Sequence, residues 1–105
     1  MKFTRSQQLE KMLAHEIAQI LPEFFSSQRY GMLTVTGVSC AKSFDSARVR
    51  VSVLRNGHQF DEDARKVVAR IQQILNKKLV MKKIPKLIFD LDKTASLIDK
   101  LENLG

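Results

Sequence analysis

Three segments between residues 47 and 91 follow one another in an order that limits the possible folds more than any other feature. In ARVRVSVL (Ala47–Leu54) apolar and polar residues alternate, which is typical of a strand with one buried face. From Asp61 to Leu79 the apolar residues recur at steps of three and four, which indicates an amphipathic helix. Alternation returns in Lys86–Leu91. Since a strand–helix–strand passage within one sheet forms a right-handed crossover, we expect the two strands to be parallel.

The helix predicted at 61–79 has an apolar side and charged ends. Asp61 is the expected N-cap residue, and Glu62 and Asp63 follow in the first turn, where carboxylates favour the helix dipole. Lys77 and Lys78 in the last turn complement the dipole at its other end. The predicted buried stripe consists of Ala64, Val67, Val68, Ile71, Ile74, Leu75 and Leu79.

The N-terminal segment predicts a second amphipathic helix. From Thr4 to about Leu21, apolar residues again recur at steps of three and four, so that one side of the helix can be buried. Thr4 and Gln7 fit a capping box at its start. Pro22 either ends this helix or kinks it, because proline removes a helical hydrogen bond.

The remaining elements complete an α+β fold. Met32–Val38 is rich in strand formers, residues 39–46 suit the loop of a hairpin, and residues 94–104 allow a short terminal helix. The predicted order is helix, strand, strand, helix, strand, with the helices on one face of a three-stranded mixed sheet. Because the chain has 105 residues and no linker-like segment, we expect residues 1–105 to form a single domain.

Positive charge is concentrated in one part of the sequence. The chain has 18 Lys and Arg residues against 11 Asp and Glu residues, a formal net charge of +7. One interpretation of the basic stretch is a capped helix end followed by a solvated loop. We favour a surface that binds nucleic-acid phosphates, because no acid interrupts residues 65–89. The basic residues of this stretch are Arg65, Lys66, Arg70, Lys77, Lys78, Lys82, Lys83 and Lys86.

The favoured interpretation predicts one exposed RNA-binding surface, built from the long helix and its exit loop and extended by the outer face of the sheet. The alternative is a protein-interaction module whose basic face docks on an acidic protein or on a membrane surface. The predicted RNA-binding residues are Arg48, Arg50, Lys66, Arg70, Lys77, Lys78, Lys82, Lys83 and Lys86.

The aromatic content bears on the kind of nucleic acid. The chain has no Trp, one Tyr and six Phe, and most of the Phe residues are at positions that suit the core. A stacking platform for single strands is therefore weakly supported. We expect the protein to hold folded RNA by its shape and its phosphates.

Catalytic and metal-binding interpretations have less support. His15, His58 and Cys40 are far apart in the sequence, and nothing in their spacing predicts a nucleophilic pair. Asp90 and Asp92 would face the same side of a strand and could bind Mg²⁺, but two carboxylates without a third ligand more often carry solubilising charge or pair with lysines. We therefore predict a protein that is not an enzyme and has no cofactor.

The predicted compartment is the cytoplasm. A single cysteine cannot form an internal disulfide, and no apolar run approaches the about 20 residues that cross a bilayer. The start of the sequence also lacks the apolar stretch of a signal peptide.

Three segments, in the same order, resemble a known family. RYGMLTVTGV (29–38), ARVRVSV (47–53) and PKLIFDLDKT (85–94) are similar to segments of ribosome-binding factor A, a bacterial ribosome maturation factor, and the resemblance runs from Arg5 to Leu101. It implies a type II KH-like fold and a non-enzymatic factor that binds free small (30S) ribosomal subunits. It further implies a role in late maturation and 5′-end processing of 16S ribosomal RNA. We expect the chain to act as a monomer with no membrane partner.

The chain departs from the family pattern in the long helix. Family members usually carry Ala-x-Gly at a kink between two helices, whereas the corresponding residues here, Val67, Val68 and Ala69, include no glycine. We therefore expect one nearly continuous helix. The acid that usually follows the first strand is replaced by Ser43, with Asp45 displaced from the usual position.

Overall fold

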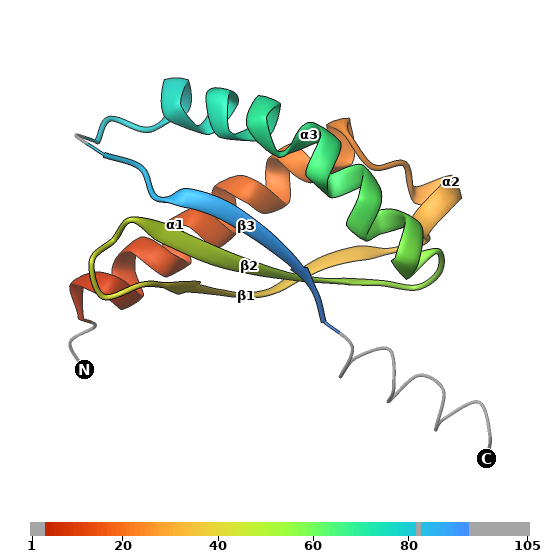
Figure 1. The fold of residues 1–105 in the computed structure, drawn as a ribbon, viewed down its shortest axis with the longest axis horizontal. Helices are drawn as coiled ribbons and strands as arrows, with labels where there is room; N and C mark the ends of the chain where they lie inside the picture. Colours follow the sequence, from red (N-terminus) through yellow and green to blue (C-terminus); the bar gives the residue numbers. More distant parts are fainter. Residues whose placement is uncertain (1–3, 82, 93–105) are drawn as a thin grey trace, which may run out of the picture.

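The chain forms a three-stranded sheet with its helices on one side (Figure 1). The computed structural model describes residues 4–81 and 83–92. The predicted order of elements is confirmed, with a 3₁₀ turn and a short helix added after the first helix. The predicted helix at 94–104 lies outside the described residues. The elements are α1 (Arg5–Ile20), η1 (Leu21–Glu23), α2 (Ser27–Tyr30), β1 (Leu33–Cys40), β2 (Ser46–Val53), α3 (Gly57–Lys78) and β3 (Lys86–Leu91).

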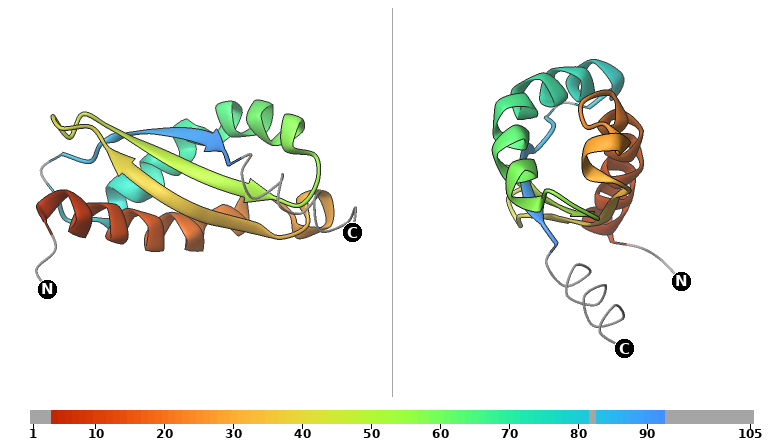
Figure 2. Two further views of the ribbon diagram at one scale, coloured as in Figure 1. Left: turned by 90° about the horizontal axis from the view of Figure 1, so that it is seen from below. Right: turned by 90° about the vertical axis from the view of Figure 1, so that its right-hand side faces the viewer.

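The sheet is mixed, as predicted. Its central strand β2 pairs with β1 in antiparallel and with β3 in parallel orientation, so that Val49 lies between Val38 and Phe89. Figure 2 shows α1 and α3 on the same side of the sheet; among the described residues no helix covers the other side, which we call the uncovered side. The polar residues of the strands lie on this uncovered side.

The core lies between the sheet and the two long helices. The apolar residues of β2 that were predicted to face inward are all buried, and α1 and α3 cover them. Full burial of one such aliphatic side chain stabilises the fold by about 1.5–3 kcal/mol relative to exposure. The fully buried apolar side chains include Leu13, Ile17, Ala47, Val49, Val51, Phe60, Ile71 and Leu75.

Helix α1 begins as predicted, and the position of its end shows which of the two predicted effects Pro22 has. The Thr4 hydroxyl accepts the Gln7 N–H at 3.1 Å, and the Gln7 side chain accepts the Thr4 N–H at 3.0 Å, which completes the capping box. The helix ends at Ile20, and Pro22 lies in the 3₁₀ turn η1 that follows. Pro22 therefore ends the helix and does not kink it.

Helix α3 begins four residues earlier than predicted, and Asp61 is not its N-cap residue. The N-cap position is Asn56, which has a left-handed backbone (φ 59°), and its side-chain amide donates to the Arg29 carbonyl at 2.6 Å. No acid lies in the first turn of this helix. The extra turn contains Phe60, which is fully buried. Tertiary packing therefore extends the helix to a start earlier than the one predicted from the sequence.

The rest of α3 agrees with the prediction. Lys77 and Lys78 lie in its last turn, and the helix continues without interruption through residues 67–69, where the family usually has a kink. This confirms the expected single helix. Ala64, Ile71 and Leu75 are buried, and the other residues of the predicted stripe are partly buried against the core.

An aromatic cluster attaches η1 and α2 to the start of α3. The rings of Phe25 and Phe60 lie 4.8 Å apart between centroids, and Tyr30 packs edge-on against both. The Tyr30 hydroxyl donates to Asp63, which also receives a hydrogen bond from Gln59 at 3.0 Å. Burial, followed by this hydrogen bond, raises the pKa of Tyr30 to about 12. Tyr30 therefore stays protonated and keeps donating at neutral pH.

Strand β1 extends further than predicted, and its irregular pattern has a structural cause. It continues through Ser39 and Cys40, so the hairpin loop is shorter than the predicted 39–46. A register shift between Val35 and Gly37 marks a β-bulge, which interrupts the alternation of apolar and polar residues. At the end of the strand, the Cys40 N–H donates to the Glu10 carboxylate of α1 at 2.7 Å.

Candidate nucleic-acid interface

The exposed side of α3 carries the first group of predicted cations. Lys66, Arg70 and Lys77 are exposed, as is Gln73 between them. The Arg70 guanidinium lies 6.0 Å from the centre of the Phe24 ring, which places this side of the helix next to η1. We call Lys66, Arg70, Lys77 and Lys78 the helix surface.

The uncovered side of the sheet carries the second group. Arg48 and Arg50 alternate with the buried residues of β2, and Lys86 is exposed at the start of β3. The Arg48 guanidinium pairs with Asp90 at 2.9 Å, and Arg50 Nη1 donates to the Ser39 hydroxyl at 2.8 Å. We call Arg48, Arg50 and Lys86 the sheet surface.

The loop before β3 contributes Lys83. Its ammonium group pairs with Asp45 of the β1–β2 hairpin loop, and hydrogen bonds from Lys83 and then from Ser43 lower the pKa of the Asp45 carboxyl. The Asp45 carbonyl also accepts the Lys86 N–H at 3.0 Å. The hairpin loop and the start of β3 thus meet at one end of the molecule, which we call the hairpin end. Lys82 lies outside the described residues.

The predicted cations do not form the single surface that we expected. On α3, Gln72 reaches toward β3 and bonds Pro85 and Leu87, whereas Arg70 lies on the η1 side. The helix surface therefore points away from β3. The sheet surface lies beyond the strands, on the side that neither long helix covers (Figure 2). Whether either surface contacts RNA stays a prediction.

Acidic neighbours are also more frequent than the sequence suggested. Arg48 and Lys83 pair with Asp90 and Asp45, and Lys78 lies 3.6 Å from Glu16 of α1. These carboxylates belong to segments outside the basic stretch (65–89), so the absence of acids within that stretch did not indicate that its cations lack acidic partners. Lys77 and Lys86 are exposed and have no ion pair among the residues that the structure describes.

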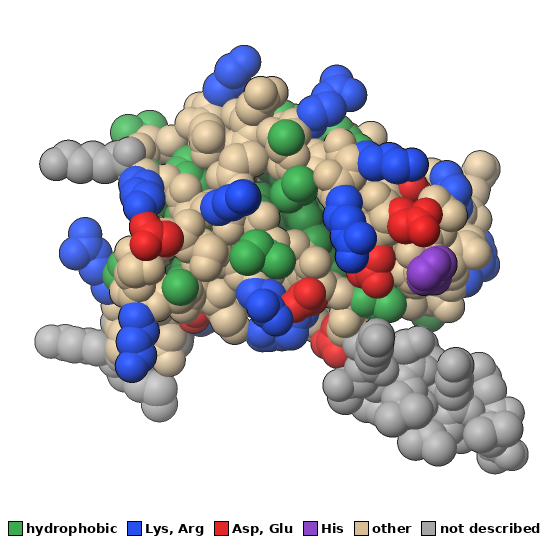
Figure 3. Space-filling view, viewed as in Figure 1, with side chains coloured by type: hydrophobic (Ala, Val, Ile, Leu, Met, Phe, Trp, Pro, Cys, Tyr) green, Lys and Arg blue, Asp and Glu red, His purple; other side chains and the backbone are tan. Residues whose placement is uncertain are grey.

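Charge is nevertheless unevenly distributed over the molecule. Figure 3 shows Lys and Arg side chains over most of one face, while several carboxylates gather near the beginning of α3 and the end of β3. Asp61, Glu62 and Asp63 belong to the first half of α3, and Asp90 to the end of β3. Arg29 and Arg48 pair with Asp63 and Asp90 here, which leaves Asp61 and Glu62 to repel a polyanion, and we therefore expect a polyanion to prefer the hairpin end.

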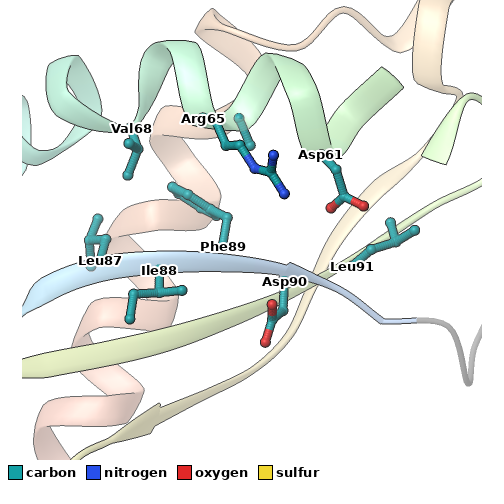
Figure 4. Close-up of a pocket in the computed structure, with 9 residues that line it drawn as sticks. Asp61, Arg65, Val68, Leu87, Ile88, Phe89, Asp90 and Leu91 are labelled. Atoms are coloured by element: carbon teal, nitrogen blue, oxygen red, sulfur yellow. The ribbon is translucent and has the colours of Figure 1, made fainter. Parts of the chain in front are cut away.

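A cleft between α3 and β3 lies near the acidic end (Figure 4). It has a volume of about 460 Å³, and its charged lining consists of Asp61, Arg65 and Asp90, with Phe89 among the apolar residues. Asp90 is already paired with Arg48. The mixed charge of this cleft makes it a poorer phosphate site than the hairpin end.

A groove at the hairpin end is the feature that sequence reasoning missed. It has a volume of about 530 Å³ and brings Arg5 of α1 next to Phe44 of the hairpin loop and Lys83. Neither Arg5 nor Phe44 was among the predicted site residues. Phe44 is the one apolar side chain in the segment KSFDS (42–46), and this signal could have marked it as a candidate for a partner.

The residues considered for catalysis or metal binding have ordinary structural contacts. Burial, followed by the nearby Glu10 carboxylate, raises the pKa of the Cys40 thiol, so the thiol stays protonated. His15 contacts Gln19 at 3.1 Å, and His58 lies 3.6 Å from Glu62. Asp90 serves as a partner for a cation, the role that we considered more common. Among residues 4–81 and 83–92 no three His, Cys, Asp or Glu side chains are grouped to hold a metal, and no helix there has the length and apolarity to span a membrane.

The fold and its basic surfaces define a class, the small KH-like α+β proteins that carry a strong positive charge. The crystal structure of ribosome-binding factor A from Thermus thermophilus has the same fold, with a TM-score of 0.74 and 22% identity over 84% of this chain and 97% of that chain. A homology model of the Thermus thermophilus factor, fitted into the cryo-EM map of its complex with the 30S subunit, superposes with a TM-score of 0.66 at 24% identity over 89% of this chain and 97% of that one.

The chain belongs to the ribosome-binding factor A family, whose sequence profile matches residues 5–104. The ribosome-binding factor A of Desulfitobacterium hafniense is 33% identical over 91 residues, which cover 84% of this chain and 73% of that protein. The resemblance inferred from the three sequence segments is thereby confirmed.

Proposed function

We propose that this chain binds the free small ribosomal subunit through its 16S ribosomal RNA. Membership of the ribosome-binding factor A family is the observation that carries this proposal. The Thermus thermophilus homologue, which shares the fold, was fitted into a map of a 30S complex. The net charge of +7 and the exposed cations at the hairpin end are the physical basis for holding ribosomal RNA.

The proposed role is assistance without catalysis. A factor that holds an immature arrangement of the 16S RNA delays use of the particle and gives other enzymes access to the 5′ end, so the chain acts in late maturation and 5′-end processing. The exposed cations support a docking role, and we propose no catalytic task for Cys40, His15 or His58, whose neighbours are Glu10, Gln19 and Glu62. We expect the protein to act as a monomer in the cytoplasm, where ribosomes assemble.

Co-sedimentation with separated small and large subunits tests the proposal. We expect the wild-type chain to sediment with small subunits and not with large ones, and to bind naked 16S RNA at low salt. Lys86→Gln should reduce the slope of log affinity against log salt by about 1, because one phosphate contact is lost. Lys86 is exposed and has no ion pair among the described residues, so this variant should fold normally.

Lys11→Gln on α1 is the matched control, because Lys11 is also an exposed lysine but lies outside the predicted set. Its salt slope should equal that of the wild type. Circular dichroism confirms that both variants are folded. Failure of the wild-type chain to bind small subunits and 16S RNA at low salt would refute the proposed function, as would equal binding to both subunits.

A further inference from the structure

We propose that the groove at the hairpin end binds an unpaired nucleotide of the ribosomal RNA, with the base against Phe44 and the adjoining phosphates on Arg5 and Lys83. This inference rests on the proposed function, because it concerns one part of the same RNA. It also revises the expectation from the sequence, in which recognition depended on the shape and the phosphates of the RNA and aromatic stacking played little part.

The floor of the groove is apolar and comes from three separate segments. Leu9 and Met12 belong to α1, Phe44 to the hairpin loop and Met81 to the segment before β3. Met12 and Met81 remain 37% and 38% exposed, so the groove has not closed over its own apolar surface. Its volume of about 530 Å³ is within the range of sites that hold small ligands, and a single base fits easily.

Phe44 is held in position by its backbone and by its neighbours. Its φ angle of 61° is in the left-handed region, which bulky residues rarely adopt, and its N–H donates to the Ala41 carbonyl at 2.9 Å in a tight turn. The next residue, Asp45, is attached to Lys83 and to the backbone of Lys86. Strained residues that persist in a fold are frequent at ligand-binding sites, because the neighbouring contacts fix them.

The rim of the groove is positively charged. Arg5 and Lys83 line it, and no carboxylate does so among the described residues. Asp45 pairs with Lys83, but the two side chains are 62% and 65% exposed, and an ion pair so accessible to water exchanges readily with a phosphate. Gln8, also in the lining, offers an amide that can donate to and accept from the edge of a base.

The combination of an apolar floor and a cationic rim favours a nucleotide over other occupants. An aliphatic peptide side chain would fill the floor but offer no anion to Arg5 or Lys83. A nucleotide supplies a flat ring for Phe44 and an anion for Arg5 and Lys83, and unpaired bases of folded RNA are commonly recognised by stacking on aromatic side chains. The lipids of an anionic membrane share the negative charge, and the experiment therefore includes vesicles.

Photocrosslinking of the full-length wild-type chain tests the site without any substitution. The probe is a 16S RNA transcript in which 5-iodouridine replaces uridine, and the crosslinked peptides are mapped by mass spectrometry. We expect crosslinks on Phe44 or Met81. Crosslinks confined to other segments would overturn the inference.

A pair of matched variants provides the second test. Phe44→Leu keeps the apolar bulk and removes the ring, and we expect it to weaken binding of 16S RNA by about five- to hundredfold, the usual cost of one lost base stack. Its salt slope should stay unchanged, since no charge is altered. Phe24→Leu is the control, because Phe24 is also a partly buried ring but lies under Arg70, remote from the groove.

The outcomes separate this inference from the proposed function. If the wild-type chain binds small subunits and Phe44→Leu binds as tightly as Phe24→Leu, the groove is not a nucleotide site and the proposed function stands. If the wild-type chain binds neither small subunits nor 16S RNA, the proposed function fails and this inference fails with it. Loss of binding by Phe44→Leu to phosphatidylglycerol vesicles alone, with RNA binding intact, overturns the inference in favour of a membrane.

Discussion

At the scale of single residues, Gly37 decides where Arg50 lies. Gly37 is at the β-bulge of β1, opposite Arg50 in β2. A Cβ atom at position 37 would collide with Arg50 Nη2 and lie 3.0 Å from the guanidinium carbon. The Arg50 side chain therefore lies across β1 in the space that the missing Cβ leaves, and Ser39 fixes it through a hydrogen bond. A guanidinium held in this way loses little freedom when it binds a phosphate.

Gly37→Ala should weaken RNA binding with little effect on stability. The obstacle to the new methyl group is the end of a flexible side chain, so Arg50 can move away and the strand can stay intact. We expect the affinity for 16S RNA to fall while the free energy of unfolding in urea changes by less than about 1 kcal/mol. Ser39→Ala, which releases Arg50 without adding bulk, should have the same direction of effect. Unchanged affinity in both variants would show that the placement of Arg50 is irrelevant to binding.

At the scale of elements, Gln72 joins α3 to the beginning of β3. Its amide nitrogen donates to the Pro85 carbonyl at 3.1 Å, and its oxygen accepts the Leu87 N–H at 2.9 Å. The Gln72 side chain thus makes the hydrogen bonds that a neighbouring strand would make at this edge of the sheet. It thereby fixes the segment that contains Lys83 and Lys86. At the other edge, Glu10 of α1 accepts the Cys40 N–H in a similar way.

Gln72→Ala should lower the free energy of unfolding by about 1–3 kcal/mol, because two partly buried backbone groups lose their partners. Gln73→Ala is the matched control, since Gln73 is the next residue of the same helix and is exposed. The control should be within about 0.5 kcal/mol of the wild type. Urea unfolding followed by circular dichroism measures both. Equal stability of the two variants would mean that the Gln72 bridge contributes nothing.

At the scale of the whole molecule, cations lie on two surfaces that one flat partner cannot cover together. The sheet surface adjoins the hairpin end, where Lys83, Lys86 and the groove meet. It lies away from the carboxylates at the start of α3, and its one ion pair joins Arg48 to Asp90 among the described residues. The helix surface is flanked by Asp63, whose pKa is lowered mainly by the hydrogen bond from Tyr30 and to a lesser extent by Lys66, and by Glu16 beside Lys78. We therefore expect the RNA to contact the sheet surface and the hairpin end.

Two double variants of equal charge locate the interface. Arg50→Gln/Lys86→Gln on the sheet surface should reduce the salt slope of RNA binding by about 2, because two phosphate contacts are lost. Lys66→Gln/Arg70→Gln on the helix surface should leave the slope close to that of the wild type. The slope is measured by titrating 16S RNA at several salt concentrations. The reverse result would assign the interface to the helix surface.

The sequence by itself determined the two long helices, the three strands and their order, because the spacing of apolar residues within a helix or strand sets which of its faces is buried. The alternation in β2 and β3 could be predicted for this reason. The capping box of α1 could be predicted from Thr4 and Gln7, and the uninterrupted α3 from the absence of glycine at 67–69. Only the tertiary structure decided the start of α3, where burial of Phe60 outweighed the capping signal of Asp61. It also divided the cations between two surfaces and brought Arg5, Phe44 and Lys83 into one groove. Charge pairing and groove formation depend on the distances in space between residues that are far apart in the chain. The pattern of residues along the sequence does not give those distances.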